Sequence, residues 1–431
     1  MLIGFVFLIS FWNIAAGFPH NSSEVVANIK DHVSLYKTLS SESLCTENAC
    51  CNISSPDSCD IALLPKGQST LVLPGMDTRC IFSYSTPFAF QVIPGRSDKV
   101  VFYFQGGGAC WDQTSTEAGT YCTTDSSPQS PVGIFDPNNS DNKYKDYTII
   151  HALYCSGDVW MGDTVREYND DAGVPVQQVG LKNAQTVLDW AVRQQLTGGL
   201  ESELADLVVM GCSAGSVGAQ IWGGKIIAAM KSKTASVVPD SYAGYFPTGT
   251  ESSLINQYGF CKSDFMSSSL TEKCCNNTVT FREIMTEQMQ NSPETIYAYM
   301  QSKVDNIQMS FYMSVGMTAG VDYLITPAEF YSGVNDIFAL YNKEPNFVTY
   351  MIDGSQHCFT PYNNYYTANA DGAEDSVYDG LSLNDWASAY PLSNGDVVNT
   401  ICDGEITSSP IKHEIDYCDA EVVPKSFTEE Y

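Results

Sequence analysis

The segment Gly211-Cys212-Ser213-Ala214-Gly215 places a serine between two glycines, at a spacing that suits a nucleophilic hydroxyl. Residues 206–210 before it are apolar and β-prone, and residues 216–231 after it have the composition of a helix. A serine on a sharp turn between a strand and a helix is held away from the backbone, where it can attack a carbonyl carbon. We therefore predict that Ser213 is a catalytic nucleophile; the alternative is an ordinary glycine-rich turn.

A serine hydroxyl reacts readily only when a base removes its proton, and histidine is the usual base. His357 lies on the loop after residues 347–352, an apolar run typical of a strand. An α/β sheet of this kind carries its catalytic histidine at such a place, so we predict that His357 is the base. The other four histidines are less suitable candidates. His20 and His32 lie in the N-terminal extension, His151 lies in an apolar strand, and His413 lies in an acidic tail.

A carboxylate should orient that histidine, and in this architecture it lies between the serine and the histidine in chain order. The candidates are Asp305, Asp322, Asp336 and Asp353. Asp305 follows a strand-like run at residues 296–300 and precedes a helical run, which would place it at the carboxyl end of a strand. Asp353 is close to His357 in sequence and would serve to shape its loop. We favour Asp305 as the acid.

Acyl transfer builds negative charge on the carbonyl oxygen, and backbone N–H groups aimed at that oxygen stabilise it. Gly106-Gly107-Gly108 follows a buried-strand pattern at residues 99–104 and lets the backbone approach a substrate closely. The N–H of Ala214, directly after Ser213, is the other expected donor. A phosphate-binding loop is the alternative, but no Gly-Lys-Ser or Gly-Lys-Thr follows these glycines.

These residues need a scaffold that brings several strand ends to one edge of a sheet. From Cys80 onward, segments typical of strands alternate with segments typical of helices, such as the amphipathic run 181–196. This alternation predicts an α/β-hydrolase-like domain over residues 80–431, with a mainly parallel sheet and helices on both faces. Residues 252–291 contain three cysteines and little periodicity, so we predict an insertion or a lid there.

The N-terminal residues indicate secretion. Residues 1–17 have an apolar core followed by small residues, as in a signal peptide, and an uncleaved anchor is the alternative. Residues 18–79 follow as a Cys-rich extension, and no later stretch is long and apolar enough to span a bilayer. We expect an extracellular or cell-wall protein with no stable membrane insertion. Four N-x-S/T sites fit a secreted glycoprotein: Asn21, Asn52, Asn138 and Asn276.

The chain has 15 cysteines, which suits an oxidising compartment. An odd count leaves at least one unpaired, and we expect it to be Cys212, at the buried end of the strand before the serine. The vicinal pairs Cys50-Cys51 and Cys274-Cys275 should each bridge to other partners, because neighbours rarely meet disulfide geometry. A metal site is not expected, because the sequence has no paired C-x-x-C motifs and no histidine cluster.

The formal net charge of −29 restricts the partners of this chain. Nucleic acid is excluded as a partner, because its phosphates would be repelled. A polyanionic substrate would also be repelled at neutral pH and low salt.

Five segments, in this order, resemble the pectinacetylesterase/Notum family of secreted carboxylesterases over residues 80–357. They are 104–111 (FQGGGACW), 154–159 (YCSGDV), 211–216 (GCSAGS), 302–308 (SKVDNIQ) and 354–358 (GSQHC). The resemblance implies a Ser-Asp-His triad whose acid, in a D-x-x-Q context ending at Gln308, corresponds to Asp305. It also implies that the oxyanion donors are Gly107, Gly108 and Ala214.

The resemblance further implies a serine esterase that forms an acyl-enzyme and needs no cofactor or metal, and we expect it to be a monomer. The expected substrate is an O-acetylated cell-wall or extracellular polysaccharide such as pectin. The alternative is a protein O-fatty-acyl (palmitoleoyl) ester, as in the Notum branch, which carries a bulky aromatic residue where this chain has Gly108. An alternative of another class is a secreted binding glycoprotein without turnover.

Overall fold

The computed structural model describes residues 27, 30, 44–45, 49–53, 59–352, 354–368, 382–388 and 401–402. The expected signal peptide at 1–17 and the acidic tail lie outside these residues. So do several residues considered above: His20, Asn21, His32, Asp353 and His413.

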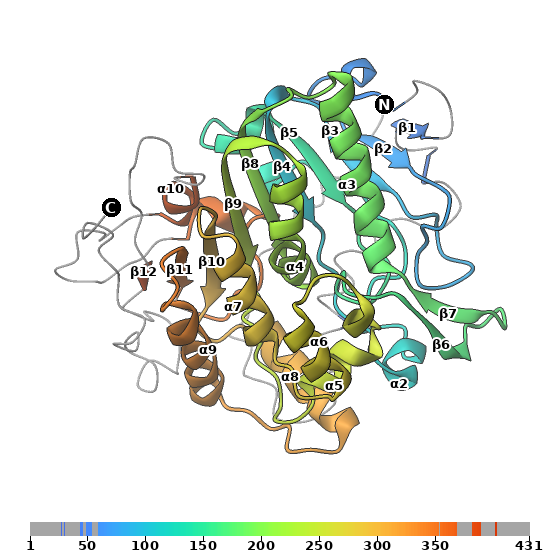
Figure 1. Cartoon of the computed structure of the whole chain (residues 1–431), viewed down its shortest axis with the longest axis vertical. Helices are drawn as coiled ribbons and strands as arrows, with labels where there is room; N and C mark the ends of the chain where they lie inside the picture. The colour runs from blue at the N-terminus through green and yellow to red at the C-terminus, as the bar shows by residue number, and fades with distance from the viewer. Residues whose placement is uncertain are drawn as a thin grey trace, which may run out of the picture.

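A ten-stranded sheet forms the centre of the fold (Figure 1). Its strands lie in the order β1-β2-β3-β5-β4-β8-β9-β10-β11-β12. Their bounds are β1 Ala49–Asn52, β2 Thr70–Leu73, β3 Phe90–Ile93, β4 Arg96–Phe104, β5 Tyr147–Ala152, β8 Leu204–Cys212, β9 Ser232–Asp240, β10 Ile296–Ser302, β11 Phe347–Ile352 and β12 Ile401–Cys402. Only β3 pairs antiparallel with its neighbours, β2 and β5. The predicted, mainly parallel sheet is therefore confirmed.

Both faces of the sheet are covered, because alternate residues of its strands enter two separate cores. In β4, Val100, Phe102 and Phe104 enter the first core and Val101 and Tyr103 the second. The first core contains α3 Gly180–Thr197, α4 Ala214–Ala229, α7 Phe281–Asn291, α8 Asn306–Ala319 and α9 Pro327–Tyr341. The second contains the short helices η2 Gly133–Phe135, η3 Lys143–Asp146, η5 Asn363–Tyr366 and α10 Leu383–Ser388. Burial on both faces explains the nearly continuous apolar run of each central strand.

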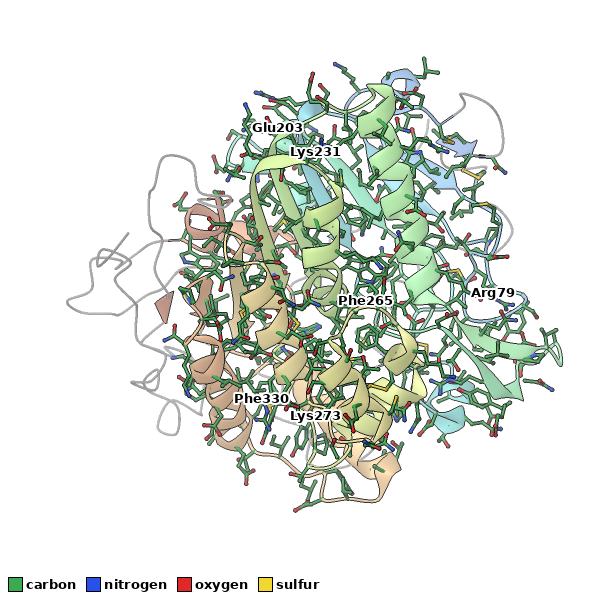
Figure 2. All side chains as sticks on the ribbon, viewed as in Figure 1. Arg79, Glu203, Lys231, Phe265, Lys273 and Phe330 are labelled. Atoms are coloured by element: carbon green, nitrogen blue, oxygen red, sulfur yellow. A yellow bond between two sulfur atoms is a disulfide. The ribbon has the colours of Figure 1, made fainter. Side chains whose placement is uncertain are left out.

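The parallel arrangement brings the carboxyl ends of the central strands to one edge. Glu203 directly precedes β8 and Lys231 directly precedes β9, and both lie at the opposite end of the sheet (Figure 2). Ser213 directly follows β8, Asp305 follows β10, and His357 follows β11. The predicted triad thus stands on three strand ends of one sheet.

Most of the remaining elements surround this edge: α2 Gln113–Glu117, the antiparallel pair β6 Thr164–Asn169 and β7 Pro175–Gln178, α5 Glu251–Gln257, η4 Phe260–Lys262 and α6 Ser268–Cys275. The short helix η1 Ile61–Leu63 lies instead at the opposite edge, beside the start of β4 and the end of α3. The predicted lid at 252–291 comprises most of α5, then η4, α6 and α7, and Cys261–Cys274 links it internally. None of the helices described here has the length and apolarity needed to cross a bilayer.

Six disulfides link the described residues: Cys45–Cys50, Cys51–Cys59, Cys80–Cys155, Cys110–Cys122, Cys212–Cys358 and Cys261–Cys274. The prediction of a free Cys212 is therefore wrong. Its partner follows His357 and is 146 residues away, so only the folded sheet brings the two sulfurs together. The free thiol among the described cysteines is the exposed Cys275. Cys50 and Cys51 bridge to Cys45 and Cys59, as predicted for the first vicinal pair. In the second pair, Cys274 bridges to Cys261 as predicted, but Cys275 is a free thiol.

Candidate active site

The turn that carries Ser213 is built by contacts that only glycine allows. A Cβ at Gly211 would lie 2.1 Å from the carbonyl oxygen of Gly215, and a Cβ at Gly215 would lie 1.9 Å from that of Phe104. Ser213 itself has φ 59° and ψ −124°. Such a conformation costs a residue with a side chain on the order of 1–3 kcal/mol. The structure therefore contains the strained strand-to-helix turn predicted from the glycine spacing.

His357 and Asp305 form a buried pair. The imidazole Nδ1 lies 2.9 Å from Oδ1 and 2.7 Å from Oδ2 of the Asp305 carboxylate. The two side chains are 4 % and 0 % exposed. Of the competing aspartates, Asp322 and Asp336 are exposed on the surface. The structure thus brings the favoured aspartate, and neither of those two, to the histidine.

The Asp305 carboxylate is fixed by the helix that follows it. It caps the N-terminus of α8, where Oδ1 accepts hydrogen bonds from the N–H groups of Ile307 and Gln308 at 3.1 and 2.9 Å. The side-chain amide of Gln308 donates to Oδ2 at 2.9 Å and to Gln301 Oε1 at 2.9 Å. N-terminal N–H groups and the helix dipole favour a negative charge. The D-x-x-Q spacing therefore fixes the orientation of this carboxylate toward the imidazole.

The glycine loop after β4 lies beside the serine turn. Gly107 has φ 144° and Gly108 has φ 76°, and a Cβ at Gly107 would lie 2.5 Å from Thr123 Oγ1. Gly108 and Ala214 line the same cavity as Ser213, whereas Gly107 is not among the residues that line it. Two of the three predicted oxyanion residues are thus at the cavity, and the third shapes the loop that presents Gly108.

A mostly apolar cavity of about 80 Å³ connects these residues. Ser213 and His357 both line it, together with Gln308. Aromatic rings form much of the remaining wall: Trp111, Tyr242, Tyr245, Phe246, Tyr258, Phe281, Phe311 and Tyr312. Four residues of this wall belong to the predicted lid segment: Leu254, Ile255, Tyr258 and Phe281. Five belong to α8: Ile307, Gln308, Phe311, Tyr312 and Val315. The cavity can hold an apolar group next to the serine oxygen.

Two further sequence predictions concern His151 and the absence of a metal site. His151 is fully buried in β5, where its Nδ1 lies 3.0 Å from Gln91 Oε1, and burial lowers its pKa to about 3. It is the neutral core histidine that the apolar strand suggested.

Cys212, His357 and Cys358 place three metal-ligating atoms within 4.8 Å of one another. Metals bind the thiolate, however, and both sulfurs are held in a disulfide, so this cluster gives no support to a metal site.

Comparison with known proteins places this geometry in a family. The family model for pectinacetylesterases matches residues 86–323, more than half of the chain. The crystal structure of the Wnt deacylase Notum from Drosophila shares the fold, with a TM-score of 0.53 and 16% sequence identity, over 77% of this chain and 95% of that chain. No curated protein matches the sequence. The chain belongs to the pectinacetylesterase family and is a carboxylic ester hydrolase.

Proposed function

We propose that Ser213, His357 and Asp305 are the catalytic triad of this esterase. Ser213 Oγ attacks the ester carbonyl carbon, and His357 takes the hydroxyl proton and passes it to the leaving alcohol. A water molecule then attacks the acyl-enzyme, giving one proton to His357, which returns it to Ser213 as the carboxylic acid leaves. Asp305 accepts the Nδ1–H bond and stabilises the imidazolium. Ala214 and the 106–108 loop, through Gly108, donate N–H groups to the oxyanion.

One observation carries this proposal: His357, which is paired with the buried Asp305, lines the same cavity as Ser213. The pair orients the imidazole, the strained turn presents the hydroxyl, and the cavity supplies a place for the acyl group. A binding glycoprotein without turnover would have no use for a strained serine beside such a pair. The six disulfides support our further proposal that the enzyme acts outside the cell or in the cell wall.

The size of the cavity favours a short acyl group. Its volume of about 80 Å³ is roughly half of the ~150 Å³ apolar cavity that holds one benzene molecule, so it has room for roughly three carbon atoms. We therefore propose that the substrate is an acetyl ester on an extracellular polysaccharide. Pectin and neutral acetylated glycans are both candidates, and the net charge of −29 favours the neutral ones at low salt.

A second candidate is the removal of a longer acyl chain from a protein. The extent of the apolar wall favours it, because a methyl group does not need eight aromatic rings. Part of that wall comes from 252–291, which we propose is a lid. Displacement of lid side chains would lengthen the cavity. The Notum structure is of a Wnt deacylase, which is the chemistry that this candidate requires.

A series of p-nitrophenyl esters from acetyl to hexadecanoyl separates the two candidates. Wild-type enzyme should hydrolyse acetyl to butanoyl esters fastest, and Ser213→Ala should give the background rate for every ester. Phe311→Ala enlarges the cavity and should move the optimum to longer chains. A wild-type maximum at eight carbons or longer would contradict the acetyl proposal. Absence of wild-type hydrolysis, with no labelling of Ser213 by a fluorophosphonate, would favour the binding glycoprotein.

A further inference from the structure

The carboxyl end of β9 holds a buried acidic residue, Asp240, directly beside the serine turn. Asp240 pairs with Cys212 across β8 and β9 and is completely buried. Its backbone carbonyl oxygen accepts the N–H of Ser213 at 3.0 Å. Asp240 does not line the cavity, so its carboxyl group does not contact a substrate there. Its backbone is nevertheless bonded to the proposed nucleophile.

The side chain of Asp240 holds the segment that follows His357. Oδ2 accepts hydrogen bonds from the N–H of Phe359 at 2.9 Å, and from the N–H and the hydroxyl of Thr360, each at 2.7 Å. Oδ1 accepts the Ser241 hydroxyl at 2.8 Å, and Ser241 Oγ in turn accepts the N–H of Cys358 at 2.9 Å. Three consecutive residues after the proposed base are therefore fixed directly or through one hydroxyl.

We propose that Asp240 is a positioning residue that sets the place of His357 relative to Ser213. The inference rests on the triad proposed above. Burial raises the pKa of Asp240, and an apolar side chain would fill the same space without the cost of burying a carboxyl group. The carboxyl group bonds to the segment after His357, and the backbone carbonyl of the same residue accepts the N–H of Ser213. Asp240 therefore connects the two segments whose separation a Ser-His pair must control. A misplacement of about 1 Å can lower turnover about 100-fold, so the distance between the two side chains should strongly affect kcat.

Substitution of Asp240 separates positioning from stability. Asp240→Ala removes both side-chain acceptors, keeps the backbone carbonyl bonded to Ser213, and should lower kcat about 100-fold on a p-nitrophenyl acetate substrate. KM should change little, because no residue of the acyl cavity is altered. Asp240→Asn keeps a carbonyl oxygen that can face Phe359 and Thr360, so it should restore most of kcat. This rescue by the amide is not expected if the charge alone stabilises the fold.

Asn346→Ala provides a matched control for lost stability. Asn346 is buried just before β11, and its side-chain amide donates to the carbonyl oxygens of Met289, Ser292 and Thr295 at 2.9–3.1 Å. It lies at the end of β11 opposite to His357. Its substitution should lower Tm and leave kcat at the wild-type value. An equal loss of kcat in Asn346→Ala and Asp240→Ala would assign both effects to general destabilisation and overturn the proposal.

Two outcomes need a second variant or a reference reaction. If Asp240→Ala does not fold, Ser241→Ala still removes the hydroxyl between Asp240 and the Cys358 N–H, and kcat should fall while KM is kept. Wild-type kcat in folded Asp240→Ala would refute the positioning role, and so would wild-type kcat in Ser241→Ala where Asp240→Ala does not fold. Wild-type protein that hydrolyses no ester and leaves Ser213 unlabelled would refute the proposed triad instead.

Discussion

At the scale of single residues, the roles that we propose for Ser213, His357 and Asp305 depend on one another. The serine hydroxyl is unreactive without a base, and the imidazole is poorly oriented without the carboxylate that accepts its Nδ1–H. The 2.7 Å contact between Asp305 Oδ2 and His357 supplies that orientation, and the Gln308 amide donates to the same oxygen. Each proposed role can therefore be tested by what remains when one member is removed.

Ser213→Ala and His357→Ala should each lower kcat by roughly 10⁴- to 10⁶-fold, because either change stops formation of the acyl-enzyme. The double variant should be hardly worse than either single one, since the two groups act in the same step. Hydrolysis of a p-nitrophenyl ester measures kcat, and thermal unfolding checks that each variant is folded. Losses that multiply in the double variant would show that the two residues act independently.

Asp305→Asn should lower kcat by roughly 10⁴-fold, because an amide can present its N–H groups to Nδ1 and stabilise the wrong tautomer. Asp322→Asn is the matched control: Asp322 is another aspartate from the same stretch of chain, but it is exposed. It should retain wild-type kcat. Comparable losses in the two variants, measured on the same ester, would remove Asp305 from the mechanism.

At the scale of elements, the strand ends of β8, β9 and β11 are joined by more than the sheet. The Cys212–Cys358 disulfide links the residue before Ser213 to the residue after His357. Asp240 of β9 holds the same segment by hydrogen bonds. The disulfide and the hydrogen bonds hold the same short loop. Loss of either should therefore lower turnover more strongly than it changes the acyl cavity.

The Cys212→Ala, Cys358→Ala double variant should lower both Tm and kcat, because removal of a native disulfide commonly costs about 2–5 kcal/mol and here also frees the histidine loop. The matched control replaces Cys51 and Cys59, whose bridge lies in the N-terminal extension. It should lower Tm with no loss of kcat. Peptide mapping without reduction checks the bridge itself, and recovery of Cys212 as a free thiol would contradict it.

At the scale of the whole molecule, the charge of −29 acts on every anionic substrate that approaches. The repulsion has a reach of about 10 Å at 0.1 M salt and shortens as the ionic strength rises. It cannot select an acyl group, but it can select the polymer that carries the ester. Charge and cavity thus control different parts of substrate recognition.

The apparent affinity for acetylated pectin should improve when salt is added or the pH is lowered. Added ions screen the repulsion, and acid neutralises carboxylates on both partners. A neutral acetylated glycan is the control and should show little dependence on either. Measurement of KM for both polymers over a salt series tests this expectation. A KM for pectin that rises with salt would mean that a local basic surface, and not the net charge, governs binding.

Much of the fold and of the candidate site could be predicted from short-range features of the sequence. The strand-to-helix turn at Ser213 follows from Gly211 and Gly215, whose contacts are made within a few residues or with the adjacent strand. The mainly parallel sheet follows from apolar runs buried on both faces. His357 was identifiable because few histidines lie after a strand. Such features can be predicted because the residues that mark them are near neighbours in sequence, even where a contact that they permit, such as that of Gly215 with Phe104, reaches another strand.

The remaining features were decided by contacts between residues far apart in the chain. Asp305 was one of several candidates until the sheet placed it 2.7 Å from His357, 52 residues away. The partner of Cys212 is 146 residues away, and the odd cysteine count together with its place at the buried end of a strand led to the wrong prediction of a free thiol. Asp240 was not singled out, since it resembles any acidic residue at a strand end until its bonds to residues 358–360 are seen. Only tertiary packing of side chains from several elements sets these distances and the volume of the cavity.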